Sequence, residues 1–262
     1  MTPLLAHGVA GLALPLGVGV VLGLLGGGGS ILALPIFLYV FQVPTKPAVA
    51  MSLAVVGMSA FVGFLGHWRQ GTVSLRVALP FGGFAMLGAF VTARLAHYVP
   101  ERVQLTLFMI FALSAAVLML RDAAKPSAGG DVPTDFRGAF SPLLAVQAIG
   151  VGALTSLIGA GGGFVIVPAL VLLARVPVKV AVGSSLLIIT MNALSGFVGY
   201  MGTHVPIDWP LVGGFTTIAA IGALLGTRLV RYVPQRRIKQ GFAVLILVLG
   251  AYVIARSLGL TG

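Results

Sequence analysis

The stretch Gly26-Gly27-Gly28-Gly29-Ser30 interrupts an apolar run near the beginning of the chain and is followed by Leu34-Pro35. A run of four glycines is a poor helix, because each glycine costs roughly 0.5–1 kcal/mol relative to alanine in a helix interior. A similar stretch, Gly159-Ala160-Gly161-Gly162-Gly163, begins 133 residues after the first and is followed by Val167-Pro168. Two such interruptions within apolar segments predict two helix breaks at equivalent places.

The composition around these breaks is that of an integral membrane protein. Of the 262 residues, 58% are hydrophobic and only 8% are charged, whereas about a quarter of the residues of a soluble domain are charged. Several uncharged stretches provide the roughly 20 residues that a helix needs to cross a bilayer. The sequence therefore predicts an all-α polytopic protein of a cell membrane, plasma or inner, surrounded by membrane lipid.

The net charge of +11 would suggest a nucleic-acid partner in a soluble protein. Here the basic residues stand singly between apolar segments, as the positive-inside rule describes for membrane proteins, so we expect no nucleic acid. The chain has no cysteine, which excludes disulfides and thiol chemistry, and no metal-ligand cluster or nucleotide motif is visible. We therefore expect neither a metal nor a cofactor.

The second half of the chain repeats the first. Matching residues lie 133 positions apart through the first three segments of each half and 134 apart afterwards, as in Pro35/Pro168, Lys46/Lys179 and Arg94/Arg228. The expected apolar segments are 4–24, 30–42, 47–66, 78–96 and 104–120, then 142–158, 164–174, 180–200, 210–229 and 238–256. We predict an N-terminal membrane repeat at 1–120, a polar linker at 121–141 and a C-terminal membrane repeat at 142–262.

Five membrane segments in each half, an odd number, would make the second half enter the membrane from the opposite face. The basic residues favour this arrangement, because all 16 Lys and Arg residues fall on one side except Lys46, Arg94, Arg102 and Arg256. We therefore predict two inverted repeats, with both termini outside the cytoplasm. The segments that follow the glycines are too short to cross alone and are predicted to be broken or re-entrant helices; re-entrant hairpins and pairs of full spans both stay open.

Short, glycine-interrupted segments at matching places in two inverted halves are typical of secondary transporters, whose site lies where two broken helices meet. At each break the next helix exposes unpaired N–H groups and the positive end of its dipole, which favour an anion. The substrate-binding residues predicted at the breaks are Gly27, Gly28, Gly29, Ser30, Gly161, Gly162 and Gly163. Close helix packing is the competing explanation of these glycines.

Polar side chains after the breaks supply further candidates for substrate binding, because hydroxyl and amide donors suit sulfonate or carboxylate oxygens. These residues are Ser52, Ser184, Ser185 and Asn192. For each hydroxyl, a hydrogen bond back to its own helix is an equally good explanation. Lys46 and Lys179 lie next to prolines and are predicted to attract anions at opposite mouths of the pathway, or else to extend their side chains toward the membrane surface.

Acidic side chains are absent from the predicted membrane segments. All five fall in loops or at interfaces, namely Glu101, Asp122, Asp131, Asp135 and Asp208. No carboxylate is then available for a cation site or a proton relay inside the membrane, so proton coupling would need the substrate itself or His67, which we expect at the membrane interface. The nucleophile and base of an intramembrane enzyme are also not visible, and we expect no enzymatic activity.

The two glycine blocks, each followed by a Pro-x-Lys-x-Ala step and by the Ser-Leu pairs Ser52-Leu53 and Ser185-Leu186, make the sequence resemble the TauE/SafE family of sulfite exporters. The likeness covers nearly the whole chain. It implies export, or more broadly movement, of sulfur oxyanions or organosulfonates, for which we expect alternating access. A passive anion channel, or a permease for carboxylates, is the alternative, and the sequence leaves homo-oligomerisation open.

Overall fold

The computed structural model describes residues 8–27, 29–124, 142–159, 162–163, 166–167, 170, 178–203 and 205–229. Over these residues the regular elements are helices, and none is a strand. They are α2 (Gly8–Leu25), α3 (Ser30–Pro35), η1 (Ile36–Val40), α4 (Thr45–Arg69), α5 (Leu75–Leu95), η2 (Ala96–Tyr98), α6 (Glu101–Ala124), α7 (Pro142–Ile158), α9 (Val178–Met201) and α10 (Trp209–Leu229). The predicted segment 238–256 and most of 164–174 lie outside the described residues.

Four of the described helices, α4, α5, α9 and α10, are long and apolar enough to cross a membrane. Shorter apolar helices cover residues 11–25, 30–40 and 142–158. The bounds follow the predicted segments, with one clear difference at the linker. Helix α6 continues to Ala124, so the first four residues of the predicted linker 121–141 are helical. Arg121 and the two alanines that end the helix are good helix formers, so the helix does not stop where the apolar residues do.

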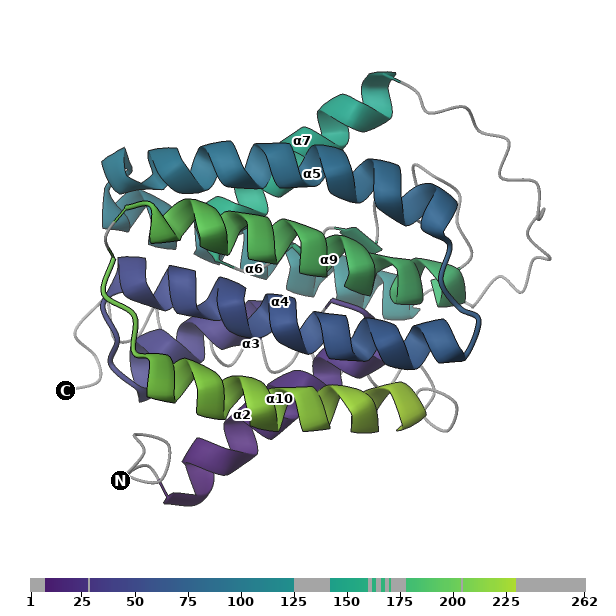
Figure 1. The fold of residues 1–262 in the computed structure, drawn as a ribbon, viewed down its shortest axis with the longest axis horizontal. Helices are drawn as coiled ribbons and strands as arrows, with labels where there is room; N and C mark the ends of the chain where they lie inside the picture. The colour runs from purple at the N-terminus through teal and green to yellow at the C-terminus, as the bar shows by residue number, and fades with distance from the viewer. Residues whose placement is uncertain are drawn as a thin grey trace.

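The long helices form one layer in the order α5, α9, α4, α10, as Figure 1 shows. Helix α2 crosses α10 and helix α7 crosses α5. The Ser74 N–H, in the connection after α4, donates to the Ser184 hydroxyl near the start of α9 (2.8 Å). The connection after α9, at 206–208, lies beside the start of α4. Helices α4 and α9, which occupy matching positions in the two halves, therefore run in opposite directions.

The two outer crossings are built from equivalent residues. A methyl group on Gly19 of α2 would overlap the carbonyl of Ala219 in α10. A methyl group on Gly152 of α7 would likewise overlap the carbonyl of Ala85 in α5. Gly19 matches Gly152, and Ala85 matches Ala219, in the sequence repeat. Small residues thus let the backbones approach closely in both crossings, and each crossing joins a helix of one half to a helix of the other.

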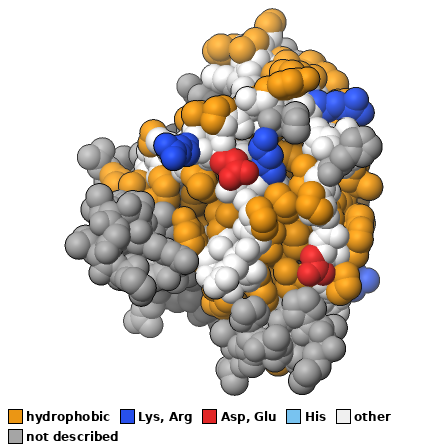
Figure 2. All heavy atoms as spheres, turned by 90° about the vertical axis from the view of Figure 1, so that its left-hand side faces the viewer, with side chains coloured by type: hydrophobic (Ala, Val, Ile, Leu, Met, Phe, Trp, Pro, Cys, Tyr) orange, Lys and Arg blue, Asp and Glu red, His pale blue; other side chains and the backbone are white. Residues whose placement is uncertain are grey.

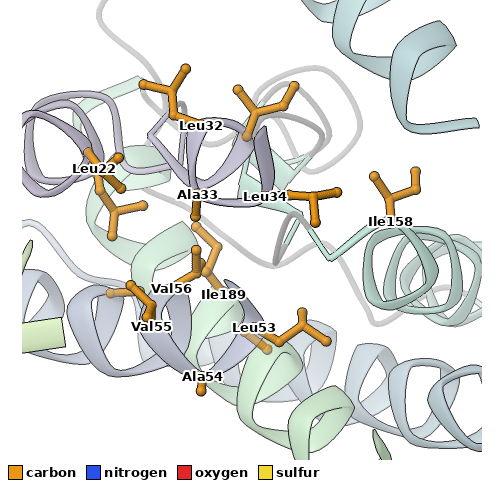
Figure 3. Close-up of a cluster of buried hydrophobic side chains, with 14 of the residues drawn as sticks. Leu22, Leu32, Ala33, Leu34, Leu53, Ala54, Val55, Val56, Ile158 and Ile189 are labelled. Carbon is orange, nitrogen blue, oxygen red and sulfur yellow. The ribbon is translucent and has the colours of Figure 1, made fainter. Parts of the chain in front are cut away.

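Helix α3 lies inside the protein, and all six of its residues are buried. In Figure 3, Ala33 points toward Val56 of α4 and Leu34 toward Ile158, the last residue of α7. A π-helical turn, η1, continues α3 as far as Val40. Together the two elements rise about 16 Å, half of the hydrocarbon thickness, which agrees with the prediction that this segment is too short to cross alone.

The outward faces of the long helices are apolar. Exposed side chains include Leu79, Leu87 and Val91 of α5 and Ile221 of α10. Figure 2 looks onto the end of the layer where α9 connects to α10, and charged side chains are scattered there among apolar ones. An outer surface of this kind suits lipid rather than water. Together with the apolar helices, it makes the protein a multi-pass membrane protein.

Candidate functional site

The first break begins where α2 ends. Gly26 has a positive φ of 67°, a conformation that glycine adopts without strain and that commonly ends helices. Its N–H still donates to the carbonyl of Leu22 (2.9 Å). The Ser30 hydroxyl, at the start of α3, donates to the carbonyl of Gly27 (2.7 Å). A methyl group on Gly29 would overlap the carbonyl of Val18, so this glycine packs against α2.

The second break repeats this local structure after α7. Gly159 has a positive φ of 74°, and Gly162 one of 86°. The Gly162 carbonyl accepts a hydrogen bond from the N–H of Ile166 (2.9 Å), which opens the segment after the break. The predicted site residues Gly28 and Gly161 lie outside the described residues.

The two breaks touch each other. A methyl group on Gly27 would overlap the backbone of Gly163, and a methyl group on Gly163 would overlap the backbone of Gly27. Two backbones approach so closely here that neither residue has room for a side chain. The expected convergence of the two breaks is therefore observed at this pair, and so is the close packing that the competing explanation requires. Anion binding by the breaks stays a prediction.

One serine holds each break against the opposite half. The Ser52 hydroxyl, on α4, donates to the carbonyl of Gly159 at 2.7 Å, with the carbonyl of Val49 as a second acceptor at 2.8 Å. The Ser185 hydroxyl, on α9, donates to the carbonyl of Gly26 at 2.6 Å. Ser52 and Ser185 are equivalent in the repeat, as are Gly159 and Gly26. The two bonds are therefore one interaction made twice, and each crosses from one half to the other.

The predicted residue Asn192 reaches the second break through another side chain. Its Nδ2 donates to the hydroxyl of Thr155 on α7 (2.7 Å), and the Thr155 side chain packs against Gly162. Sequence reasoning missed Thr155, because its partner in the repeat is the apolar Leu22. A polar residue in the last turn before a break was the available signal. Ser184, in contrast, lies near the start of α9, and its hydroxyl accepts its hydrogen bond from the connection 70–74 rather than from a described residue of either break.

The two predicted lysines lie at opposite ends of the helix layer. Lys46 is in the first turn of α4, and the backbone of Lys179 is in the first turn of α9, which runs the other way. An open hollow of about 470 Å³ lies close to the Lys46 end. Its walls are mostly apolar and consist of Phe41, Gln42, Val43, Pro44, Pro47, Met51, Pro206, Ile207 and Asp208. Attraction of anions by the lysines stays a prediction.

His67 lies in the last turn of α4, and the structure buries it between α4 and α2, with 2% of its surface exposed; its expected place at the membrane interface stays a prediction. Its Nε2 lies 3.2 Å from the carbonyl oxygen of Gly23, one helical turn before the first break. The residue equivalent to His67 in the second half is Tyr200, whose hydroxyl accepts a hydrogen bond from Gln104 Nε2 (2.8 Å). Gln104 also donates to the carbonyl of Leu157, near the end of α7. A buried polar group thus contacts the helix end before each break.

The structure describes two acidic side chains. They are Glu101, at the start of α6, and Asp208, which caps α10 by accepting a hydrogen bond from the Leu211 N–H (3.0 Å). Neither forms a hydrogen bond with a described residue of the breaks. Among the described residues no three His, Asp or Glu side chains gather in a way that could hold a metal ion. The chemistry available at the breaks is therefore that of backbone amides, hydroxyls and one side-chain amide.

The fold and the site together define an all-helical, multi-pass membrane protein with two glycine breaks in contact at its centre. The chain belongs to the sulfite exporter TauE/SafE family, whose model matches residues 11–253. No solved structure matches the chain significantly.

Similar proteins are described as transporters. A "Probable membrane transporter protein" of Xylella fastidiosa (strain 9a5c) is 35% identical over 247 residues, which cover 92% of each chain. YdhB of Bacillus subtilis (strain 168), with the same description, is 27% identical over 220 residues, covering 83% of this chain and 88% of YdhB. MJ0441 of Methanocaldococcus jannaschii is 28% identical over 194 residues, 70% of each chain. The family and these names indicate a membrane transporter.

Proposed function

We propose that this protein is a secondary transporter that exports small sulfur-containing anions, such as sulfite, thiosulfate or organosulfonates. In this proposal it works by alternating access between two inverted halves, with the substrate bound between the two glycine breaks. The observation that carries the proposal is the contact of Gly27 with Gly163, flanked by the crossed hydrogen bonds of Ser52 and Ser185.

The arrangement of the helices supports inverted halves. Helices α4 and α9 are equivalent in the sequence repeat and run in opposite directions at the centre of the layer. The crossings of α2 with α10 and of α7 with α5 use equivalent glycines and alanines. A rotation that exchanges the two halves would exchange these contacts, as in transporters that rock one repeat against the other.

The chemistry of the breaks suits an anion. Each break supplies backbone N–H groups at the start of the segment that follows, and neither of the two described carboxylates forms a hydrogen bond with a described break residue. In the present conformation Gly27 and Gly163 touch, so the breaks must separate before an anion can lie between them. Separation would release the Ser52 and Ser185 hydroxyls from their carbonyl acceptors, and the same hydroxyls would then donate to anion oxygens.

Transport into proteoliposomes tests this proposal with matched glycine variants. Gly27→Ala and Gly163→Ala place a methyl group between the breaks, and we expect uptake of labelled thiosulfate to fall at least about tenfold because the closed contact cannot form. Gly17→Ala and Gly150→Ala, where the structure leaves open space, are the controls and should keep their activity. Normal uptake by both folded break variants would reject the site.

A substrate screen and a counterflow measurement define the function further. Thermal stabilisation of the purified protein by sulfite, thiosulfate, taurine, sulfoacetate or plain carboxylates identifies which class binds. Unlabelled substrate inside the vesicles should accelerate uptake of labelled substrate through a carrier. Without such acceleration the protein is a passive channel, and stabilisation by carboxylates alone would make it a carboxylate permease.

A further inference from the structure

The two ends of the α4–α9 pair differ, although their residues are equivalent in the repeat. At one end, Met51 lines the open hollow between the start of α4 and residues 206–208. Met51 and its equivalent at the other end, Ser184, are both fully buried, but the Ser184 hydroxyl oxygen also accepts a hydrogen bond from the N–H of Ser74 in the connection 70–74 (2.8 Å). A methyl group on the neighbouring Gly183 would overlap the carbonyl of Thr72. The connection 70–74 therefore closes the Ser184 end.

His67 ties this connection to α2. Its Nδ1 lies 2.9 Å from the hydroxyl of Thr72, and its Nε2 lies 3.2 Å from the carbonyl oxygen of Gly23. A carbonyl only accepts, so Nε2 carries a proton, and in the neutral ring Nδ1 accepts from the Thr72 hydroxyl. The N–H of Thr72 also donates to the main-chain carbonyl of His67 (3.2 Å). One imidazole thus joins the closing connection to the helix that leads into the first break.

If the His67 ring bound a second proton, both of its hydrogen bonds could still form, but the ring would carry a positive charge inside the protein. Nδ1 would donate to the Thr72 hydroxyl, which would turn to the main-chain oxygen of His67, 3.1 Å away. Helix α2 and the connection 70–74 carry no titratable side chain. On helices α4, α5, α9 and α10 the charged residues are all basic: Arg69, Arg76 and Arg228, which are exposed, and Lys179 toward this end, and Lys46 and Arg94 toward the other. An enclosed imidazolium without a carboxylate is unfavourable unless water reaches it.

We infer that His67 is a proton-binding site that controls the opening of the Ser184 end. The neutral ring holds the connection 70–74 closed, and protonation favours the state in which the connection lifts and the ring is hydrated. Tyr200, the equivalent residue at the other end, does not titrate near neutral pH. The histidine therefore has no titrating counterpart at the equivalent position of the repeat. This inference rests on the alternating access proposed above, but its test needs no substrate.

Cysteine labelling measures the opening directly, because the chain has no cysteine of its own. Ser184→Cys reports the closed end, and Met201→Cys, whose parent side chain is 48% exposed, corrects for the chemical pH dependence of the maleimide reaction. We expect the ratio of the two labelling rates to rise roughly tenfold between pH 8 and pH 5.5, the range in which histidine titrates.

Histidine variants assign the effect. His67→Gln should abolish the pH dependence, whereas His7→Gln, His97→Gln and His204→Gln should retain it. A ratio that does not change with pH, or one whose pH dependence survives in His67→Gln, would overturn the inference.

A second variant keeps the test decisive if His67→Gln fails to fold. Thr72→Val removes the hydroxyl partner of Nδ1 and should raise the ratio already at pH 8, whereas an unchanged ratio would overturn the inference. A confirmed pH effect in a protein that transports none of the tested anions would reject the proposed function and leave the proton site in place.

Discussion

At the scale of single residues, the two crossed serine bonds hold the halves together at the breaks. Ser52 and Ser185 are fully buried, and their acceptors belong to glycines with positive φ. Any other residue at Gly26 or Gly159 would be strained, and its side chain would also meet the serine that accompanies it. Serine and glycine therefore depend on each other at both places.

The first prediction concerns these serines. Ser52→Ala and Ser185→Ala should each lower the free energy of unfolding by about 1 kcal/mol, because a buried carbonyl loses its donor. The two losses should be similar, since the contacts are equivalent. Ser114→Ala is the control, because the Ser114 hydroxyl is exposed and donates only within its own helix, to Ile110. Thermal unfolding in detergent measures the effect, and equal stability of all three variants would contradict it.

At the scale of elements, the glycines of α2 and α7 have two kinds of environment. Gly19 and Gly152 face a neighbouring backbone directly, whereas Gly17 and Gly150, also a matched pair of the repeat, face open space. Glycine is therefore required by a neighbouring backbone at Gly19 and Gly152, but not at Gly17 and Gly150, two positions earlier in each helix. Close approach of backbones explains the first pair, and the contacts of the described residues give no reason for the second.

The second prediction compares these two pairs. Gly19→Ala and Gly152→Ala should each destabilise the protein by about 1–3 kcal/mol, because a methyl group would force two helices apart. Gly17→Ala and Gly150→Ala should be neutral or stabilising by up to about 1 kcal/mol, since alanine favours the helix. Thermal unfolding again provides the comparison. Destabilisation of the same size in both pairs would show that the crossings do not depend on close backbone contact.

At the scale of the whole molecule, the two halves are interleaved. Helix α5 of the first half packs against α7 and α9, and α10 of the second half packs against α2 and α4. The division at 121–141 separates the chain in sequence, but most contacts between the long helices cross it. A movement of one half against the other would therefore change several of these contacts together.

The third prediction tests the proposed inversion. If the halves are inverted, the connections after α4 and after α9 lie on opposite sides of the membrane. Single cysteines at Gln70 and Met201, both exposed, should then react with an impermeant maleimide from opposite faces of oriented vesicles. Reaction of both from the same face would reject inverted repeats.

Sequence patterns predicted the elements well because helices and their breaks are local. Glycine runs, prolines and charged flanks placed α4, α5, α7, α9 and α10 within a few residues of their observed ends. The interior of the site was less predictable. Thr155 was missed and the burial of His67 against α2 was not foreseen, because burial depends on which helix packs on which, and a single polar residue in an apolar segment does not show its partner.

The sequence alone determined that this is a helical membrane protein with a duplicated glycine break, since composition and repetition can be read along the chain. Only the tertiary structure decided that Gly27 meets Gly163, that Ser52 and Ser185 each hold the break of the opposite half, and that His67 joins the connection 70–74 to α2. The physical reason is that these contacts join residues more than a hundred positions apart, or depend on a neighbouring helix. They exist only once the two halves have packed together.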